Sequence, residues 1–271
     1  MRMPKMSRTP IIAERIWSPL IDVTKYILVV TAITWLMVNS TKQLGYNWQW
    51  YRVPQYLYAV KDGQIFSGPL IAGLMVTLRI SGISLLLAFV FGLVTALLRL
   101  SNSLVGKIIA RVYLEVIRNT PLLVQLFFIY FVLSPVFDIS AFTSAVLALS
   151  LFEGAYASEI FRAGIVSIHR GQWEAAFSIG LNTSQTYRFI IFPQALRRIL
   201  PPLTSQAVSL VKDSALVSTI AIYDLTMRGQ AIIAETFLVF EVWFTVAAIY
   251  LIITLILSIT VFYMEKGFKV A

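Results

Sequence analysis

The sequence predicts an all-α protein that crosses a membrane several times. Of its 271 residues, 58% are hydrophobic and only 13% are charged, whereas soluble domains carry about 25% charged residues. The apolar residues form continuous runs rather than the period-two alternation of a membrane barrel. With about 20 residues for each span plus connections, the length allows five or six membrane helices.

The first expected span covers Leu20–Ser40 and follows a basic segment, residues 1–25. A cleaved signal peptide is the alternative, because a basic start precedes a short apolar core. We favour an uncleaved anchor, since no small-residue cleavage pattern follows. Residues 41–67 are rich in Tyr and Trp, which is typical of a membrane interface. A docking surface for a partner is the alternative for this segment.

Five further spans are expected: Gly68–Leu98, Thr120–Phe137, Ile139–Phe161, Leu203–Ile222 and Leu238–Met264. Between the first two of these, Ser101–Arg118 is expected to be a short basic connection. Thr120 and Pro121 are expected to begin a helix as the capping residue and the first helical residue. Pro193 is expected to interrupt the polar segment 162–198, and Pro201-Pro202 to restart the chain. Tyr223–Thr236 is expected to be a polar connection.

The positive charges are distributed unevenly between the two sides of this arrangement. With the N-terminus inside, 16 of the 22 Lys and Arg residues fall on the inner side and 4 on the outer side. Cytoplasmic loops carry such an excess, so both termini are expected to be cytoplasmic. The net charge of +9 therefore needs no nucleic-acid partner.

Several kinds of site are not expected. The chain has no cysteine and one histidine, which excludes a disulfide framework, an iron–sulfur site and a zinc cluster. Gly106-Lys107 lacks the upstream glycine of a phosphate-binding loop. We therefore expect no cofactor on this chain. His169 is expected to be solvated or near lipid headgroups.

A short helix is expected on the inner side within Gln172–Pro193. Glu174, Ala175 and Ala176 would open it, with the acid near the positive helix N-terminus, and Gly180 and Asn182 would end it. The residues alone leave two roles open: a helix that docks into a partner's groove, or an amphipathic helix that rests on the bilayer.

This segment also resembles the EAA coupling motif in the permease subunits of bacterial ABC importers. The pattern E-A-A-x3-G-x9-I-x-L-P is matched at Glu174, Ala175, Ala176, Gly180, Ile190 and Pro193, and Phe192 replaces the usual leucine. The surrounding segments resemble the polar amino-acid branch: RNTPLLVQLFF (118–128), GAYASEIFRAGI (154–165), FPQALRRILPPL (192–203) and KDSALVS (212–218). The resemblance covers about residues 68–265.

The resemblance implies a five-helix permease core over residues 68–265, with a coupling helix at about 172–184. Residues 1–67 would add one N-terminal transmembrane helix and an outer loop, and residues 266–271 a cytoplasmic tail. The implied partners are a dimer of ATPase subunits that hold ATP and Mg, a second permease, identical or related, and an extracytoplasmic amino-acid-binding protein. Polar amino acids would be imported across the inner membrane by alternating access. The residues implied to couple to the ATPase are Glu174, Ala175, Ala176, Gly180, Leu181 and Asn182.

Four charged residues fall near the middle of expected spans: Arg79, Glu153, Lys212 and Asp213. Each costs about 2.5–3.5 kcal/mol in a bilayer, so each must face the helix bundle or water. One interpretation is a substrate path, in which Arg79 binds a carboxylate and Glu153 an ammonium. The alternative is that these charges only neutralise one another. The fifth span would present Ser205, Ser209 and Lys212 as its polar face.

Other residues are expected to be structural or interfacial: Arg118, Pro121, Glu159, Arg162 and Pro193. Glu159 and Arg162 are spaced for an ion pair at the inner end of a span. Two rival classes remain. A stand-alone secondary transporter would not need the EAA segment. An intramembrane enzyme would use Glu153, Asp213 and His169 as acid and base groups, but the histidine falls in a cytoplasmic segment far from both acids.

Overall fold

The computed structural model describes residues 11–43, 45–61 and 64–269. The chain divides into two compact units, Met1–Trp48 and Gln49–Ala271. The first ten residues of the expected basic segment and the last two of the expected tail lie outside the described residues.

The first unit is built on one long helix, α1 (Ile11–Gln43). It has 33 residues and contains the whole of the expected span Leu20–Ser40. At 1.5 Å per residue it is about 50 Å long, enough to cross a bilayer and extend beyond it. The aromatic segment begins after it, where the rings of Tyr46 and Trp48 stack edge to face with centroids 5.3 Å apart.

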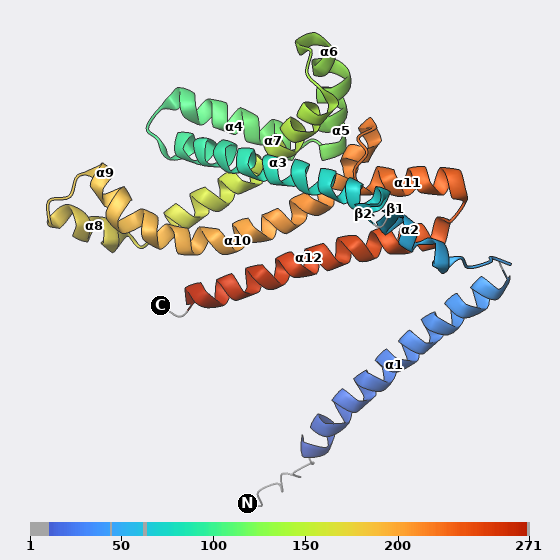
Figure 1. The fold of residues 1–271 in the computed structure, drawn as a ribbon. Coiled ribbons are helices and arrows are strands. Elements are labelled where there is room, and N and C mark those ends of the chain that lie inside the picture. The colour runs from blue at the N-terminus through green and yellow to red at the C-terminus, as the bar shows by residue number, and fades with distance from the viewer. Residues whose placement is uncertain (1–10, 44, 62–63, 270–271) are drawn as a thin grey trace, which may run out of the picture. The chain divides into compact units, whose positions relative to one another are not determined.

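The second unit contains the remaining elements (Figure 1). In chain order they are η1 (Trp50–Arg52), α2 (Pro54–Leu57), β1 (Tyr58–Lys61), β2 (Gln64–Ser67), α3 (Pro69–Leu100), α4 (Leu104–Arg118), α5 (Leu122–Phe127), the π-helix η2 (Phe128–Leu133), α6 (Ser134–Phe137), α7 (Ala141–Val166), α8 (Arg170–Ser178), α9 (Thr183–Thr186), the π-helix η3 (Tyr187–Ile191), α10 (Phe192–Asp213), the 3₁₀-helix η4 (Ser214–Ile220), α11 (Leu225–Thr236) and α12 (Val239–Lys269).

The helical, polytopic fold class is confirmed. In the described part of the chain, three helices are long and apolar enough to cross a membrane: α3, α7 and α12. The segments Leu104–Arg118 and Leu122–Phe137 are bent by 106° and make a fourth span if they cross as one broken element. The expected fifth span is divided between α10, which packs on α7 and α12, and η4.

The centre of the unit is the packing of α3 against α7. Small residues make this close approach possible. A Cβ atom on Gly92 of α3 would lie 2.7 Å from the Cβ of Ala157 and 3.1 Å from the carbonyl oxygen of Gly154. The face of α7 that contains Ser150, Gly154 and Ala157 is therefore a helix-packing face.

Figure 1 shows that the second unit has two distinct ends. The α8 end gathers α8, α9, the C-terminal ends of α3 and α7, and the C-terminal end of α12. The α11 end gathers α11, α2 and the two short strands. The strands pair antiparallel, with Tyr58 opposite Ser67, a small addition to the helices that the sequence predicts.

Two expected connections are helices. Ser101–Arg118 is not a short loop, because α4 fills it: Ser103 caps the helix through a bond from the Gly106 amide to Oγ, 3.1 Å. Tyr223–Thr236 contains α11, capped by Asp224, whose Oδ1 accepts from the Met227 amide at 2.8 Å.

The proline expectations are wrong in detail. Pro121, rather than Thr120, is the N-cap of α5, and Thr120 instead donates its hydroxyl to the Val116 carbonyl at 2.8 Å. Pro193 does not interrupt the helical segment but lies in the first turn of α10, directly after the π-helix η3. Pro201 and Pro202 lie inside α10 instead of restarting the chain.

Candidate functional site

The first candidate site is the docking helix. It is α8, and it begins at Arg170, four residues before Glu174, so that acid does not stand at the helix N-terminus as expected. The N-cap is His169, which is exposed and accepts a bond from the Gly171 amide at 3.0 Å. Glu174 pairs with Arg170 at 3.2 Å on the exposed surface.

Gly180 ends this helix, as expected. Its φ is +83°, a left-handed conformation that favours glycine. The amide of Leu181 returns to the carbonyl of Ala176 at 3.1 Å, which closes the helix end. Asn182 then caps α9 in a reciprocal pair with Gln185. The stop at Gly180 and Asn182 is therefore confirmed.

The α8 segment is supported from one side and exposed on the other. Trp173 packs edge to face on Tyr187 with ring centroids 4.9 Å apart, and Ala176 is buried. The opposite side exposes Glu174, Ala175, Gly180 and Asn182. Two apolar side chains of this segment, Phe177 and Ile179, are also exposed. The sequence reasoning missed them although both lie inside the motif.

The second candidate site surrounds Glu153, at the middle of α7. This carboxylate is 1% exposed. Its Oε2 accepts a hydrogen bond from Gln206 Nε2 at 2.6 Å, and the Asp213 carboxyl lies beside it. Its Oε1 has no hydrogen-bond partner in the described part of the protein. A cavity of about 200 Å³ touches Glu153 and Gln206 and is otherwise lined mainly by apolar groups of α3, α7 and α10.

The structure does not bring the four midplane charges together. Glu153 and Asp213 are neighbours, but Lys212 is exposed and lies in a groove with Ser205, Ser209 and Ser258. Arg79 is exposed on α3 and makes no ion pair with any described residue. The mutual neutralisation of Arg79 and Glu153 that the sequence left open is therefore not observed.

Gln206 is a site residue that the sequence reasoning missed. It shares a face of α10 with Leu210 and Asp213, spaced i, i+4 and i+7. The face chosen from the sequence, with Ser205, Ser209 and Lys212, is the adjacent one. The available signal in the sequence was the polar amide of Gln206, which lies seven residues before Asp213 on the same helical face.

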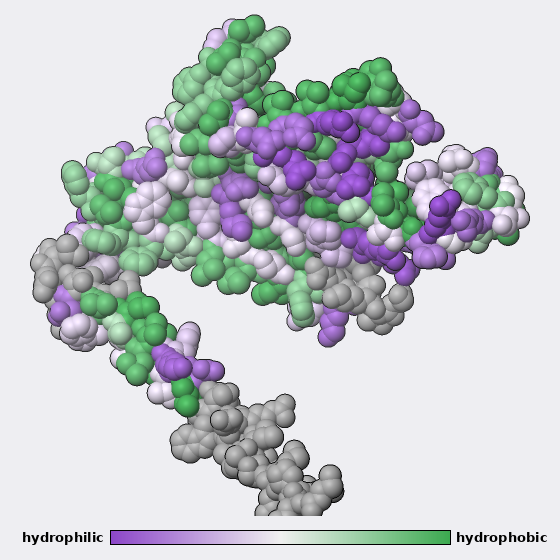
Figure 2. All heavy atoms as spheres, turned by 180° about the vertical axis from the view of Figure 1, so that it is seen from behind, coloured by the Kyte–Doolittle hydropathy of each residue, from purple (hydrophilic) through white to green (hydrophobic). Residues whose placement is uncertain are grey.

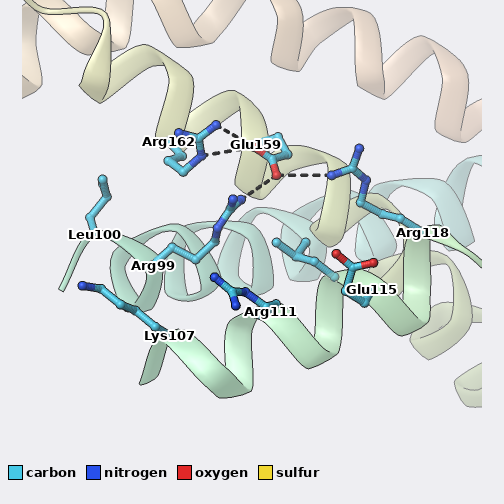
Figure 3. Close-up of a pocket in the computed structure, with 9 residues that line it drawn as sticks. Arg99, Leu100, Lys107, Arg111, Glu115, Arg118, Glu159 and Arg162 are labelled. Atoms are coloured by element: carbon cyan, nitrogen blue, oxygen red, sulfur yellow. Dashed lines mark hydrogen bonds and ion pairs between the residues drawn. The ribbon is translucent and has the colours of Figure 1, made fainter. Parts of the chain in front are cut away.

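The third candidate site is an ion cluster near the C-terminal end of α7. Glu159 Oε1 accepts from Arg99 at 2.5 Å and from Arg118 at 3.2 Å, and Glu159 Oε2 accepts from Arg162 at 3.1 Å. Figure 3 shows the three guanidinium groups converging on this carboxylate from α3, α4 and α7. The expected pair of Glu159 and Arg162 is confirmed, and it is one part of a larger cluster that joins three helices.

No group of three or more metal-ligating side chains is found in the described segments.

Known proteins resemble this chain over most of its length. The family described as the inner membrane component of binding-protein-dependent transport systems matches residues 88–270. The glutamine transport system permease protein GlnP of Escherichia coli (strain K12) is 42% identical over 204 residues, which are 74% of this chain and 93% of that protein. The L-cystine transport system permease protein TcyB of Bacillus subtilis (strain 168) is 39% identical over 226 residues, 82% of this chain and 92% of that protein.

Solved structures give the same result. A crystal structure of an amino acid ABC transporter with histidines matches with a TM-score of 0.69 and 38% identity, covering 73% of this chain and 94% of that one. An inward-facing MetNI methionine transporter matches at a TM-score of 0.62 and 19% identity, which shows the shared fold. With its EAA segment on α8, its apolar spanning helices and these matches, the chain belongs to the family of inner membrane components of binding-protein-dependent transport systems.

Proposed function

We propose that this chain is the permease subunit of an ABC importer for polar amino acids in a bacterial inner membrane. Family membership supports transport, and permeases of glutamine and cystine systems resemble the chain at 39–42% identity. ATP and Mg would be bound and hydrolysed by partner ATPase subunits, so this chain would not itself be an enzyme. Both termini would be cytoplasmic, as the charge asymmetry predicts.

The exposed side of α8 supports ATPase docking. A short helix with a small-residue surface at Ala175, apolar Phe177 and Ile179, and an open glycine turn suits insertion into a groove. The α8 end would then face the cytoplasm, and the α11 end would receive the amino acid from an extracytoplasmic binding protein. A second permease, of the same or a related chain, would complete the pore.

The buried Glu153 supports an amino-acid site. Its Oε1 lacks a donor among the described residues, and a second carboxyl, Asp213, lies beside it. An α-ammonium group carries three N–H donors and one positive charge, so it would donate to Oε1 and offset the charge of one of the two acids. The cavity of about 200 Å³ beside Glu153 and Gln206 leaves room for the rest of a small zwitterion. Arg79 is exposed on α3 and does not line this cavity.

The test is Glu153→Gln in the assembled transporter reconstituted into vesicles. We expect amino-acid uptake and substrate-stimulated ATP hydrolysis to fall by at least tenfold while the subunits still co-purify. Lys212→Gln is the matched control, because Lys212 lies on α10 next to Asp213 but is exposed and lines a different groove from Glu153. Unchanged uptake by assembled Glu153→Gln would exclude the site. Failure of the wild-type chain to co-purify with any ATPase would favour a stand-alone transporter.

A further inference from the structure

A basic cavity lies at the α8 end between α3, α4 and α7, with a volume of about 390 Å³. Five basic side chains and two carboxylates line it: Arg99, Lys107, Arg111, Arg118, Arg162, Glu115 and Glu159. Three positive charges are therefore left in excess. The cavity is too strongly charged for an apolar ligand.

Glu159 cannot neutralise the remaining charge, because both of its oxygens already accept from guanidinium groups. Lys107 and Arg111 line the same cavity from α4 (Figure 3) and pair with no carboxylate in the described part of the chain. Glu115 instead accepts from the Asn119 side chain at 3.0 Å. Lys107 and Arg111 are therefore available to an anion from outside the protein.

The surface next to this cavity is apolar. On α4, the face with Lys107 and Arg111 adjoins an apolar ridge. This ridge consists of three side chains that are each more than half exposed: Val105, Ile109 and Val112. Seen from behind, Figure 2 shows the hydrophilic band bordered by this apolar ridge in the region of α4. An anionic group in the cavity and hydrocarbon chains on the ridge would both be accommodated by one amphiphilic molecule.

We infer that this cavity binds the phosphate of an anionic phospholipid whose acyl chains lie along the apolar ridge of α4. Arginine forms paired, charge-assisted bonds to phosphate, and basic pockets between membrane helices suit such headgroups. Arg99 is the penultimate residue of α3 and α4 begins at Leu104, so the cavity lies at the helix ends, where headgroups are found. A zwitterionic lipid would bind less well, because its own cation opposes the excess positive charge.

The test titrates the full-length chain, purified in mild detergent and stripped of lipid, with dioleoylphosphatidylglycerol or dioleoylphosphatidylcholine, and counts bound lipids by native mass spectrometry. We expect phosphatidylglycerol to bind at least tenfold more tightly. The variant Lys107→Gln/Arg111→Gln should lose roughly twenty-fivefold in affinity, about fivefold for each basic side chain. Arg197→Gln, an exposed arginine of α10 away from the cavity, is the control and should bind as the parent does.

A second variant and a second ligand keep the test decisive. Lys107→Arg/Arg111→Lys retains the charges and should retain the preference even if the glutamine variant is unstable. Equal binding of the two lipids, or an undiminished preference in a folded glutamine variant, would overturn the inference. So would glycerol 3-phosphate stabilising the parent as strongly as the lipid, since the ligand would then be a soluble phosphate.

Discussion

Gly92 shows how a single residue sets the distance between two membrane helices. A methyl group at this position would meet the Ala157 side chain and the Gly154 backbone within 2.7–3.1 Å. A backbone cannot move aside as a flexible side chain can, so α3 and α7 must separate to admit even one carbon. The same reasoning does not apply to Gly82 on the same helix, where nothing lies within 4 Å.

Gly92→Ala is therefore expected to destabilise the protein by about 1–3 kcal/mol through overpacking. Gly82→Ala should be neutral or stabilise the helix by up to about 1 kcal/mol. Both can be compared by the fraction that remains monodisperse in size-exclusion chromatography after heating. Equal behaviour of the two variants would contradict the close packing at Gly92.

Asp224 makes stability depend on pH. It is fully buried as the cap of α11, at the connection after the expected fifth span, and this burial raises its pKa from 3.8 to about 6. The folded state holds the proton of Asp224 more tightly than the unfolded chain does, so protonation of Asp224 stabilises the fold. This stabilisation is complete below about pH 3.8 and is lost as the pH rises through about 6.

Asp224→Asn is neutral at every pH and keeps an oxygen for the Met227 amide. It should raise the free energy of unfolding at pH 7.5 by up to about 3 kcal/mol and flatten its change between pH 4 and 7. Thermal melts across this range check it, with exposed Glu235→Gln on the same helix as the control. A variant that melts lower than the parent at pH 7.5 would refute the argument.

At the scale of elements, the ability of α8 to dock on a partner is expected to depend on the turn at Gly180, which ends the helix. The turn at Gly180 has open space around it, so a bulky side chain there would project outward rather than into the protein. Strain from the positive φ and steric bulk toward a partner are separate effects, and two substitutions distinguish them.

Gly180→Ala introduces the strain, roughly 1 kcal/mol, and little bulk. Gly180→Trp adds a large outward side chain. We expect Gly180→Trp to abolish co-purification with the ATPase while membrane insertion is retained, and Gly180→Ala to reduce it only slightly. Normal transport by Gly180→Trp would place ATPase docking elsewhere.

The sequence predicts some elements well and others poorly, for physical reasons. The end of α8 follows from local backbone preference, because few residues other than glycine adopt the φ of Gly180. Helix α4 was missed because Lys107 and Arg111 suggest a solvated loop, although they recur one helical turn apart. Gln206 was missed because the inward face of α10 depends on where α7 packs. The bend of 106° before α5 lies at the break between Arg118 and Leu122, which contains Pro121.

At the scale of the whole molecule, charge asymmetry predicts orientation. The chain contains no cysteine, so single cysteines report topology without background. Ser178→Cys on α8 should react with a membrane-impermeant thiol reagent only from the cytoplasmic side. Trp48→Cys and Glu235→Cys should react only from outside in intact cells. Labelling of Ser178→Cys from outside would reverse the topology.

Helix α10 contacts both the α8 segment and the surroundings of Glu153. Near its start, Gln194 donates to Gln172 of α8 at 3.1 Å, and its last residue, Asp213, lies beside Glu153. Pro201 and Pro202 remove two backbone donors near the middle, which softens the helix there. The arm from Pro201 to Asp213 is about 18 Å long, so a pivot of about 10° would displace the Asp213 carboxyl by about 3 Å. A small displacement of α8 would then bend α10 at Pro201 and Pro202. The bend would make or break the contact between the carboxyl groups of Asp213 and Glu153.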